Sequence, residues 1–459
     1  MTLQSRTGSH AVRAGAADAC TTEPGRYGPT TPVAPPAVAR WALLVILFAS
    51  IFLQRFAVPG TEIGLNAAVT FAALAWLLIR GQLVLDPLHA AIFCCFASWV
   101  WLAAACNSAT TSVSSAALLT AMYLPLCASL REPGDAFTFV VGRFQAMVLI
   151  GACAGIVQFA AQFVVHSPLL FTFHGMFPRQ LLLSGFDNII PLRWGATLLK
   201  SNGFFFVEPS TYSQYLSLAI VLEVLFRRTT RRLLIYVLAL PLSYSGTGLI
   251  LLGLMLPPVL IARRAGKTMA LIVAVGALLL LLSPDLHLNV IARRANEFTS
   301  TGSSAHARFV GGFWLVSQFQ LSSAIHFVLG LGPGSFTGYA KQVPYEAHDA
   351  SWAKMLFEYG VVGSALFWAY LGVILFRRAP SRWVAAALLI GFMAFGGMLL
   401  DPRLHALILV FCVLPKIYAD RQAARAAEEV AAPACTIQTA NRCFDTSASA
   451  RNVAPPLPT

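Results

Sequence analysis

The sequence predicts an all-α membrane protein that crosses the bilayer many times. Hydrophobic residues make up 57% of the 459 residues and charged residues only 11%, whereas a soluble domain carries about 25% charged residues. The mean hydropathy is +0.70. The apolar residues form runs long enough to cross a bilayer, separated by short polar segments. Together these observations exclude an ordinary soluble domain.

About twelve apolar segments are long enough to span or nearly span a bilayer. The seventh and eighth are short and share a break, Pro241-Leu-Ser-Tyr-Ser-Gly-Thr-Gly248. Two short spans that meet at this break keep Arg232 and Arg263 on one side of the membrane, so we expect two helices here. The predicted segments are 41–58, 63–80, 87–105, 111–129, 138–165, 209–226, 233–245, 247–262, 268–283, 361–377, 383–400 and 403–419.

Basic clusters between the apolar runs predict the orientation, because short loops rich in Lys and Arg stay in the cytoplasm. The opposing turns, near 106–110 and 245–247, contain no Lys or Arg. We therefore expect both termini inside and two long loops, about 166–208 and 284–360, outside. The net charge of +13 follows this pattern, so we expect no nucleic-acid partner. The basic positions that share one side are Arg80, Arg131, Arg227–Arg232, Arg263–Lys267 and Arg377–Arg382.

Residues 41–420 form the predicted membrane domain between two cytoplasmic tails. Residues 1–40 are rich in Ala, Pro, Thr and Gly and contain no apolar run typical of a signal peptide. Residues 421–459 are similarly biased, and we expect both tails to be disordered. The 9 cysteines show neither metal-ligand nor disulfide spacing.

The long loop 284–360 is a polar island in an apolar chain, and we place the chemistry there. It contains His306-Ala-Arg308, Gly330-Leu-Gly-Pro-Gly334 and Ala347-His348-Asp349. Loops held by a rigid scaffold often carry binding and catalytic residues. An outer loop that combines Arg, a glycine turn and His is therefore the strongest candidate site.

His348 differs from the other outer histidines because it opens a helical pattern that leads into the tenth span. An imidazole fixed there would serve as a general base, although outer histidines are usually only solvated. Asp349 places a carboxylate beside it. The apolar positions of the pattern are Trp352, Met355, Leu356 and Tyr359.

Arg308 begins an amphipathic stretch that has two interpretations. An interfacial helix with a snorkelling Arg is the structural one. Capture of phosphoryl oxygens by the guanidinium fork is the functional one. The positions expected to share a face with each other are Phe309, Phe313, Val316 and Gln320.

The other outer loop ends in Lys200-Ser-Asn-Gly-Phe-Phe-Phe-Val-Glu208-Pro209. An acid followed by Pro is a good helix N-terminus, and this alone accounts for Glu208. Arg193 and Lys200 lie just upstream and would add positive charge to an anion site. No phosphate-binding GxxxxGK[ST] loop and no Asp-x-Asp pair occur in the sequence, which argues against an ATP-driven pump and a metal-dependent transferase.

In order and spacing these motifs resemble the O-antigen polymerase and O-antigen ligase superfamily of bacterial envelope membrane proteins. The resemblance covers residues 200–380 in motif and the whole chain in topology. Asp349 departs from the family, where Asn is usual, and Lys200 lies near where Arg is frequent. The segments that carry the resemblance are Gly203–Pro209, Arg308 with Trp314, Gly330–Gly334, His348-Asp349 and Phe357–Gly363.

The resemblance implies a metal-independent and cofactor-free glycosyl transfer at the outer face of the bacterial inner membrane. The donor would be a glycan on undecaprenyl diphosphate, with the lipid diphosphate as leaving group. Arg308, helped by Arg193 and Lys200, would stabilise the charge on the diphosphate, and His348 would take the proton of the acceptor hydroxyl. The residues expected to help bind substrate are Glu208, Asp349, Gly332 and Gly334.

A polymerase of lipid-linked repeat units is favoured over a ligase to lipid A core, because the Phe-rich segment before Glu208 leans toward exopolysaccharide polymerases. A lipid-linked glycan transporter and a structural partner in polysaccharide export are the alternatives. A transporter would bury ionisable residues in mid-span, and the predicted spans contain almost none. The expected partners are the lipid-linked glycan, membrane lipid and a chain-length regulator or export complex.

Overall fold

The computed structural model describes residues 34–416, apart from 62, 108–110, 166, 187, 193–194, 228, 265, 267–268, 271, 273, 275–302, 304–305, 378 and 395–396. The structure is 69% helical with few strands. Arg193, most of the ninth predicted span and nearly all of both predicted tails lie outside the described residues.

Four helices are long and apolar enough to cross a membrane, as expected of an all-α membrane protein. They are α3 (Pro87–Cys106), α5 (Ala136–Ala161), α8 (Gly246–Arg263) and α15 (Ser351–Phe376). Shorter apolar helices occupy other predicted segments, so the helices alone do not establish the number of spans. These are α1 (Ala37–Phe52), α2 (Leu65–Ile79), α4 (Val113–Tyr123), α16 (Arg382–Ala394) and α17 (Pro402–Ile408).

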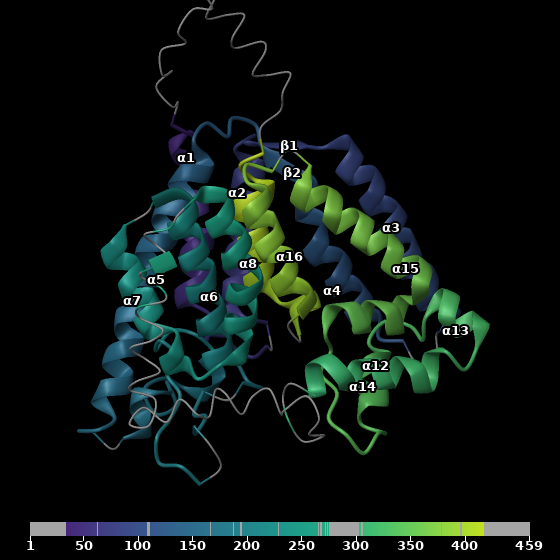
Figure 1. Cartoon of the computed structure of the whole chain (residues 1–459). Helices are drawn as coiled ribbons and strands as arrows, with labels where there is room; N and C mark the ends of the chain where they lie inside the picture. Colours follow the sequence, from purple (N-terminus) through teal and green to yellow (C-terminus); the bar gives the residue numbers. More distant parts are fainter. Residues whose placement is uncertain are drawn as a thin grey trace, which may run out of the picture. The chain divides into compact units, whose positions relative to one another are not determined.

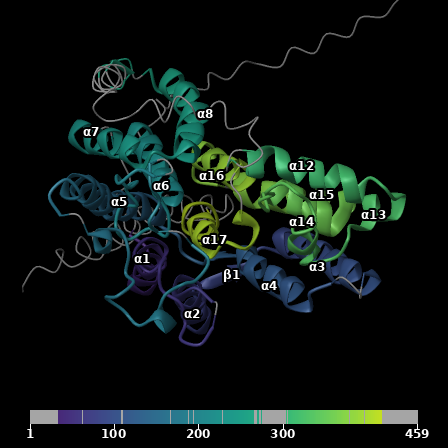
Figure 2. The same cartoon turned by 90° about the horizontal axis from the view of Figure 1, so that it is seen from below.

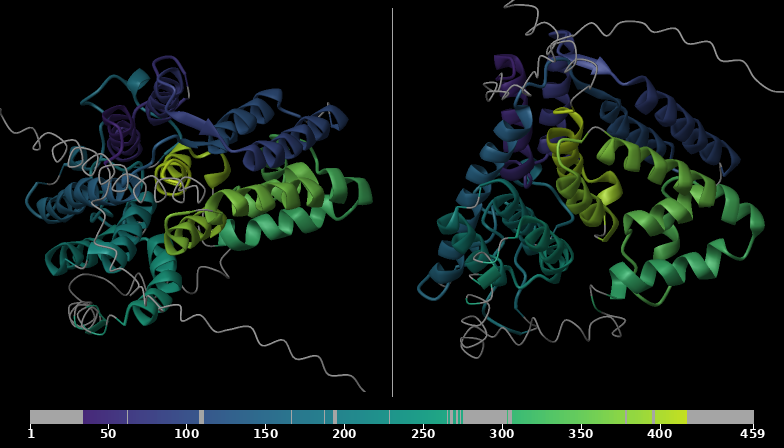
Figure 3. Two further views of the ribbon diagram at one scale, coloured as in Figure 1. Left: turned by 90° about the horizontal axis from the view of Figure 1, so that it is seen from above. Right: turned by 45° about the horizontal axis from the view of Figure 1, so that its top comes forward.

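Helices α16 and α17 lie between two groups of helices (Figures 1 and 2). On one side α15 packs against α3 and α16, and Figure 3 shows α3 (blue) beside α15 (light green). On the other side α17 contacts α1 and α16 contacts α8. The pair α16 and α17 therefore contacts both groups.

Helices α6 (Pro209–Leu222) and α8 pack closely because small residues line their contact. A Cβ added at Gly248 would lie 2.4 Å from the carbonyl oxygen of Ser213. The Ser217 hydroxyl donates to the Gly248 carbonyl at 2.7 Å. The break before α8 separates it from α7 (Thr230–Ala239), with Tyr244 at φ +45°. The predicted pair of helices is thus confirmed.

One end of the bundle carries a small two-stranded sheet and several charged contacts. Strand β1 (Leu83–Leu85) pairs antiparallel with β2 (Ala128–Leu130). Asp86 caps α3 by accepting from the Leu88 backbone N–H at 3.0 Å, and it pairs with Arg377 at 3.4 Å. The end of α15 is thereby fixed beside the start of α3.

The helices of the segment before α15 pack on the first half of that helix. They are α12 (Gly312–Leu315), between π-helical turns Ala307–Gly311 and Val316–Gln320, α13 (Ala324–Leu329) and α14 (Ser335–Ala340). The face predicted for Arg308's stretch is partly wrong. Val316 and Gln320 are buried, but Phe313 is 62% exposed. The wider π turns change the register, so Leu315 joins the buried face with Val316.

A kink at Gly360 divides α15 where the predicted span was expected to begin. Gly360 has φ +69° and ψ −174°, a conformation close to glycine-only. A Cβ there would lie 2.1 Å from the Val328 carbonyl oxygen. The kink and its close contact with the end of α13 therefore require glycine.

Gly360→Ala is expected to destabilise the fold by at least about 1–3 kcal/mol, the usual cost of a strained backbone conformation. Gly372→Ala in the same helix is the matched control, because its added Cβ meets no atom within 4 Å. That control should be neutral or slightly stabilising, by up to ~1 kcal/mol. Thermal unfolding of the purified proteins in detergent compares them, and equal midpoints would contradict the kink.

Candidate functional site

The structure brings the His348 segment against the turn that carries Arg308. The His348 backbone N–H donates to the Ala307 carbonyl at 2.9 Å. The imidazole Nε2 lies 3.3 Å from a Glu346 carboxylate oxygen, and the His348 side chain is 39% exposed. Arg308 is half-buried and has further polar or electrostatic contacts. An imidazole and a guanidinium therefore sit on neighbouring segments, with the imidazole accessible.

Asp349 connects this segment to two other elements. Its carboxylate pairs with Lys354 at 3.0 Å, and Lys354 is 7% exposed. Its carbonyl accepts from the Gly397 backbone N–H at 3.1 Å. The carboxylate that reaches the His348 imidazole is thus that of Glu346, while Asp349 fixes the start of α15 to the segment before α17.

The glycine turn packs against the kink of α15. Gly330, Gly332 and Gly334 all have positive φ, between 78° and 91°. The Gly332 N–H donates to the Glu358 carbonyl at 3.0 Å, and the Phe336 N–H donates to the Glu358 carboxylate at 3.3 Å. The turn therefore attaches the segment before α15 to that helix.

Close packing also surrounds Gly332 and Gly334 on the side of α3 and α4. An added Cβ would lie 2.5 Å from Thr111 Oγ1 at Gly332 and 2.7 Å from Ser112 Cβ at Gly334. This packing alone explains both glycines. Substrate binding by them stays a prediction.

The segment between α5 and α6 places Glu208 at the start of α6. Glu208 is half-buried and accepts from the Ser210 hydroxyl at 2.8 Å, without capping the helix through its side chain. The Glu208 carboxylate also attracts the Arg403 guanidinium electrostatically. Lys200 is half-buried, and its backbone N–H donates to the Ile190 carbonyl at 2.9 Å. Lys200 also has at least one further polar, ring or electrostatic contact. Arg193 lies outside the described residues.

A buried ion pair at the start of α17 was not predicted from the sequence. Arg403 Nε lies 2.8 Å from Asp401 Oδ1, and Arg403 Nη2 lies 2.6 Å from Asp401 Oδ2. The two residues are 8% and 5% exposed. Arg403 Nη1 has no hydrogen-bond partner, and the guanidinium carbon lies 5.0 Å from the Phe186 ring centroid.

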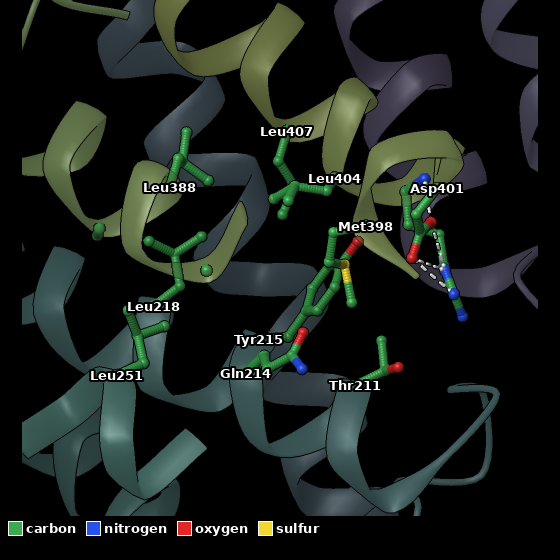
Figure 4. Close-up of a pocket in the computed structure, with 13 residues that line it drawn as sticks. Thr211, Gln214, Tyr215, Leu218, Leu251, Leu388, Met398, Asp401, Leu404 and Leu407 are labelled. Carbon is green, nitrogen blue, oxygen red and sulfur yellow. Dashed lines mark hydrogen bonds and ion pairs between the residues drawn. The ribbon is translucent and has the colours of Figure 1, made fainter. Parts of the chain in front are cut away.

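This ion pair borders a pocket of about 430 Å³, part of it open to the outside. Figure 4 shows Asp401 and Thr211 at one side of the pocket and Leu218, Leu251 and Leu388 at the other. The pocket is therefore amphiphilic. Its walls come from α6, α8, α16, α17 and the short segment 397–401.

The sequence did contain a signal for this pair. Asp401-Pro-Arg403 places two ionisable groups at the start of an apolar run, and such groups at membrane depth often mark function. The predicted span begins at Arg403 and leaves Asp401 outside it, so the apolar pattern gave no reason to pair the two residues. The Asp401 carboxylate also accepts from the Arg403 backbone N–H at 2.8 Å, as an N-cap of α17.

No protein-family model and no curated protein sequence matches the chain. Within the described part of the chain, no three His, Cys, Asp or Glu side chains come together as metal ligands would. The His348 segment and the pocket are therefore the features of the molecule that bear on function.

Asp401→Ala should destabilise the protein by about 3–5 kcal/mol, because it leaves Arg403 as an uncompensated buried cation. The double variant Asp401→Ala/Arg403→Leu should recover most of this loss. Glu132→Ala, which removes an exposed carboxylate, is the control. Denaturant unfolding in detergent measures all three. A double variant no more stable than Asp401→Ala would show that the pair is not coupled.

Proposed function

We propose that the protein polymerises undecaprenyl-diphosphate-linked oligosaccharide repeat units into exopolysaccharide or O-antigen at the outer face of the bacterial inner membrane. The observation that carries the proposal is the double attachment of the His348-Asp349 segment. It bonds to Ala307, beside Arg308, and to Gly397, beside the amphiphilic pocket. A base, a cation and a lipid-compatible pocket are thereby linked through one short segment.

In the proposed reaction the acceptor hydroxyl oxygen attacks the anomeric carbon of the donor glycan. The bond from that carbon to the diphosphate oxygen breaks, and its electron pair leaves with the lipid diphosphate. His348 takes the proton of the hydroxyl. Arg308 stabilises the negative charge on the leaving diphosphate. The leucine wall of the pocket would accept the isoprenoid chain.

The membrane placement is part of the proposal. In this proposal the chain crosses the membrane about twelve times, both termini lie in the cytoplasm, and the loops 166–208 and 284–360 lie on the outer face. A lipid-linked substrate needs a lateral apolar surface beside a polar site, and the pocket walls near Leu218 and Asp401 provide both. An O-antigen ligase would use the same donor chemistry and differ in its acceptor.

One observation favours a lipid-linked glycan transporter as the second candidate. The structure buries Lys354, Glu358, Asp401 and Arg403 in or beside apolar helices. Buried ionisable residues of this kind line transport pathways in many membrane proteins. The fate of the lipid-linked repeat separates the two, because a polymerase defect leaves it on the outer leaflet and a transport defect on the inner leaflet.

Reporter fusions test the orientation. Fusions after Arg232 and after Arg264 should report a cytoplasmic position, and fusions near Gly302 a periplasmic one, because the basic clusters stay inside. Alkaline phosphatase and a fluorescent protein give opposite signals and serve as mutual controls. A cytoplasmic signal near Gly302 would put His348 on the wrong side and end the proposal.

His348→Ala should reduce polymer by about 10²–10⁴-fold, the usual contribution of a general base, and single repeats should accumulate on the outer leaflet. His326→Ala, a half-buried histidine of the same loop, is the control and should leave polymer length unchanged. Arg308→Lys should keep more activity than Arg308→Ala, because the ammonium retains charge without the fork. Normal polymer from His348→Ala at equal protein abundance would refute the mechanism.

A further inference from the structure

Helix α13 presents large apolar side chains on its surface, although it lies in the segment expected to be polar. Leu321, Ile325, Phe327 and Val328 are all exposed, from 40% at Phe327 to 67% at Ile325. No residue of α13 is buried, and none belongs to a hydrophobic cluster of the described residues. These four side chains, called the α13 surface below, are therefore apolar groups that the described part of the chain leaves uncovered.

The end of α13 meets α15 backbone to backbone. A Cβ added at Gly360 would clash with the Val328 carbonyl oxygen, and one added at Gly330 would clash with the Glu358 carbonyl. This attachment is made by main-chain atoms, so it holds α13 in place without burying the side chains of the α13 surface.

Charged residues are absent from this part of the sequence. No Asp, Glu, Lys or Arg occurs between Phe309 and Ala340, and His326, the titratable side chain of α13, is half-buried. Charges return directly afterwards, where Lys341 and Glu346 are exposed. A helix that faces water normally carries charged or polar residues on its exposed face. The exposed face of α13 is apolar instead, which marks an interaction surface.

The α13 surface adjoins two helices that are long and apolar enough to cross a membrane. Helix α13 packs on α15, which packs on α3, and Figures 1 and 2 show α13 at the end of the α3–α15 pair. A Cβ added at Gly332, just after α13, would lie 2.8 Å from Asn107 Cβ at the end of α3. Trp101 and Leu102 are exposed about two turns before Asn107. An exposed Trp near the end of a span is typical of the membrane–water boundary.

We propose that the α13 surface inserts into the bilayer at this boundary and contacts the acyl chains of the adjacent leaflet. A soluble partner protein would leave the neighbouring faces of α3 and α15 to be covered separately, whereas a bilayer covers all three surfaces continuously. Transfer of the apolar side chains from water into acyl chains is favourable for the same reason that core packing is. The glycine turn that follows α13 is thereby held near the lipid head groups. Only the use of this depth for a lipid-linked substrate rests on the proposed function.

Photolabelling of the full-length wild type tests the insertion in nanodiscs of phosphatidylethanolamine and phosphatidylglycerol. A phospholipid with a diazirine within its acyl chain should label residues 321–328, as it labels the exposed Trp101 and Leu102 of α3. Lys341 and Gln342 are exposed in the same segment but polar, so they should stay unlabelled. Mass spectrometry of the digested protein locates the label.

A water-soluble maleimide then reports whether water reaches the surface. Ile325→Cys should react at least about tenfold more slowly than Gln342→Cys in the nanodiscs, because bringing the thiol to the reagent exposes apolar surface that the acyl chains cover. Gln342→Cys is the matched control, since Gln342 is exposed in the same segment. Leu321→Cys repeats the measurement should Ile325→Cys not fold. Modification is read on the peptide that contains the new cysteine, and both variants should react equally fast once unfolded in detergent.

Modification of Ile325→Cys as fast as Gln342→Cys would show that water covers the α13 surface and would overturn the proposal. Slow modification without lipid labelling would show that protein, either a second copy or another segment of the chain, covers the surface, and would overturn it as well. Neither measurement needs polymer synthesis. Insertion of α13 in a protein that makes no polymer would retain the surface and reject the proposed function, and polymer synthesis without labelling would do the reverse.

Discussion

The packing of segment 306–350 depends on how the backbone hydrogen bonds are satisfied where α15 kinks. At Gly360 the helix is interrupted, and the carbonyls of Phe357 and Glu358 need partners that a regular helix would have supplied. The Leu331 and Gly332 N–H groups donate to them at 2.9 and 3.0 Å. The same glycine turn that satisfies the kink thus fixes the loop to the bundle, and the His348 segment precedes that fixed helix.

Two ion pairs with buried members lie near this fixed segment. Lys354 balances Asp349 at 3.0 Å, and Arg403 balances Asp401 through two close contacts. A buried pair gains little net stability, because desolvation offsets most of the attraction. Stability therefore does not explain why the protein keeps two such pairs near the amphiphilic pocket. Their effect on position does, because they fix Gly397 and the start of α17.

The sequence predicted the parts of this arrangement that depend on local composition. Long apolar runs predicted the helices, and the Pro and Gly residues between Pro241 and Gly248 predicted the break before α8. Contacts between distant segments were not predictable in this way. The Gly332 turn was read as a candidate binding element, and its packing against Thr111 depends on a partner more than 200 residues away. The Asp401–Arg403 pair was missed because hydropathy places polar residues at span ends without regard to what they face.

The two arginines that lie near Phe186 differ in how their charge is met, and this difference separates their roles. Arg403 stacks on the ring and is neutralised by Asp401, so its field beyond the pair is weak and its position is fixed. Arg55 is held as firmly, but by carbonyl and amide oxygens that carry no net charge. Among the described residues Arg55 is therefore held by hydrogen bonds to uncharged oxygens, whereas Arg403 is held by an ion pair that also fixes the first turn of α17.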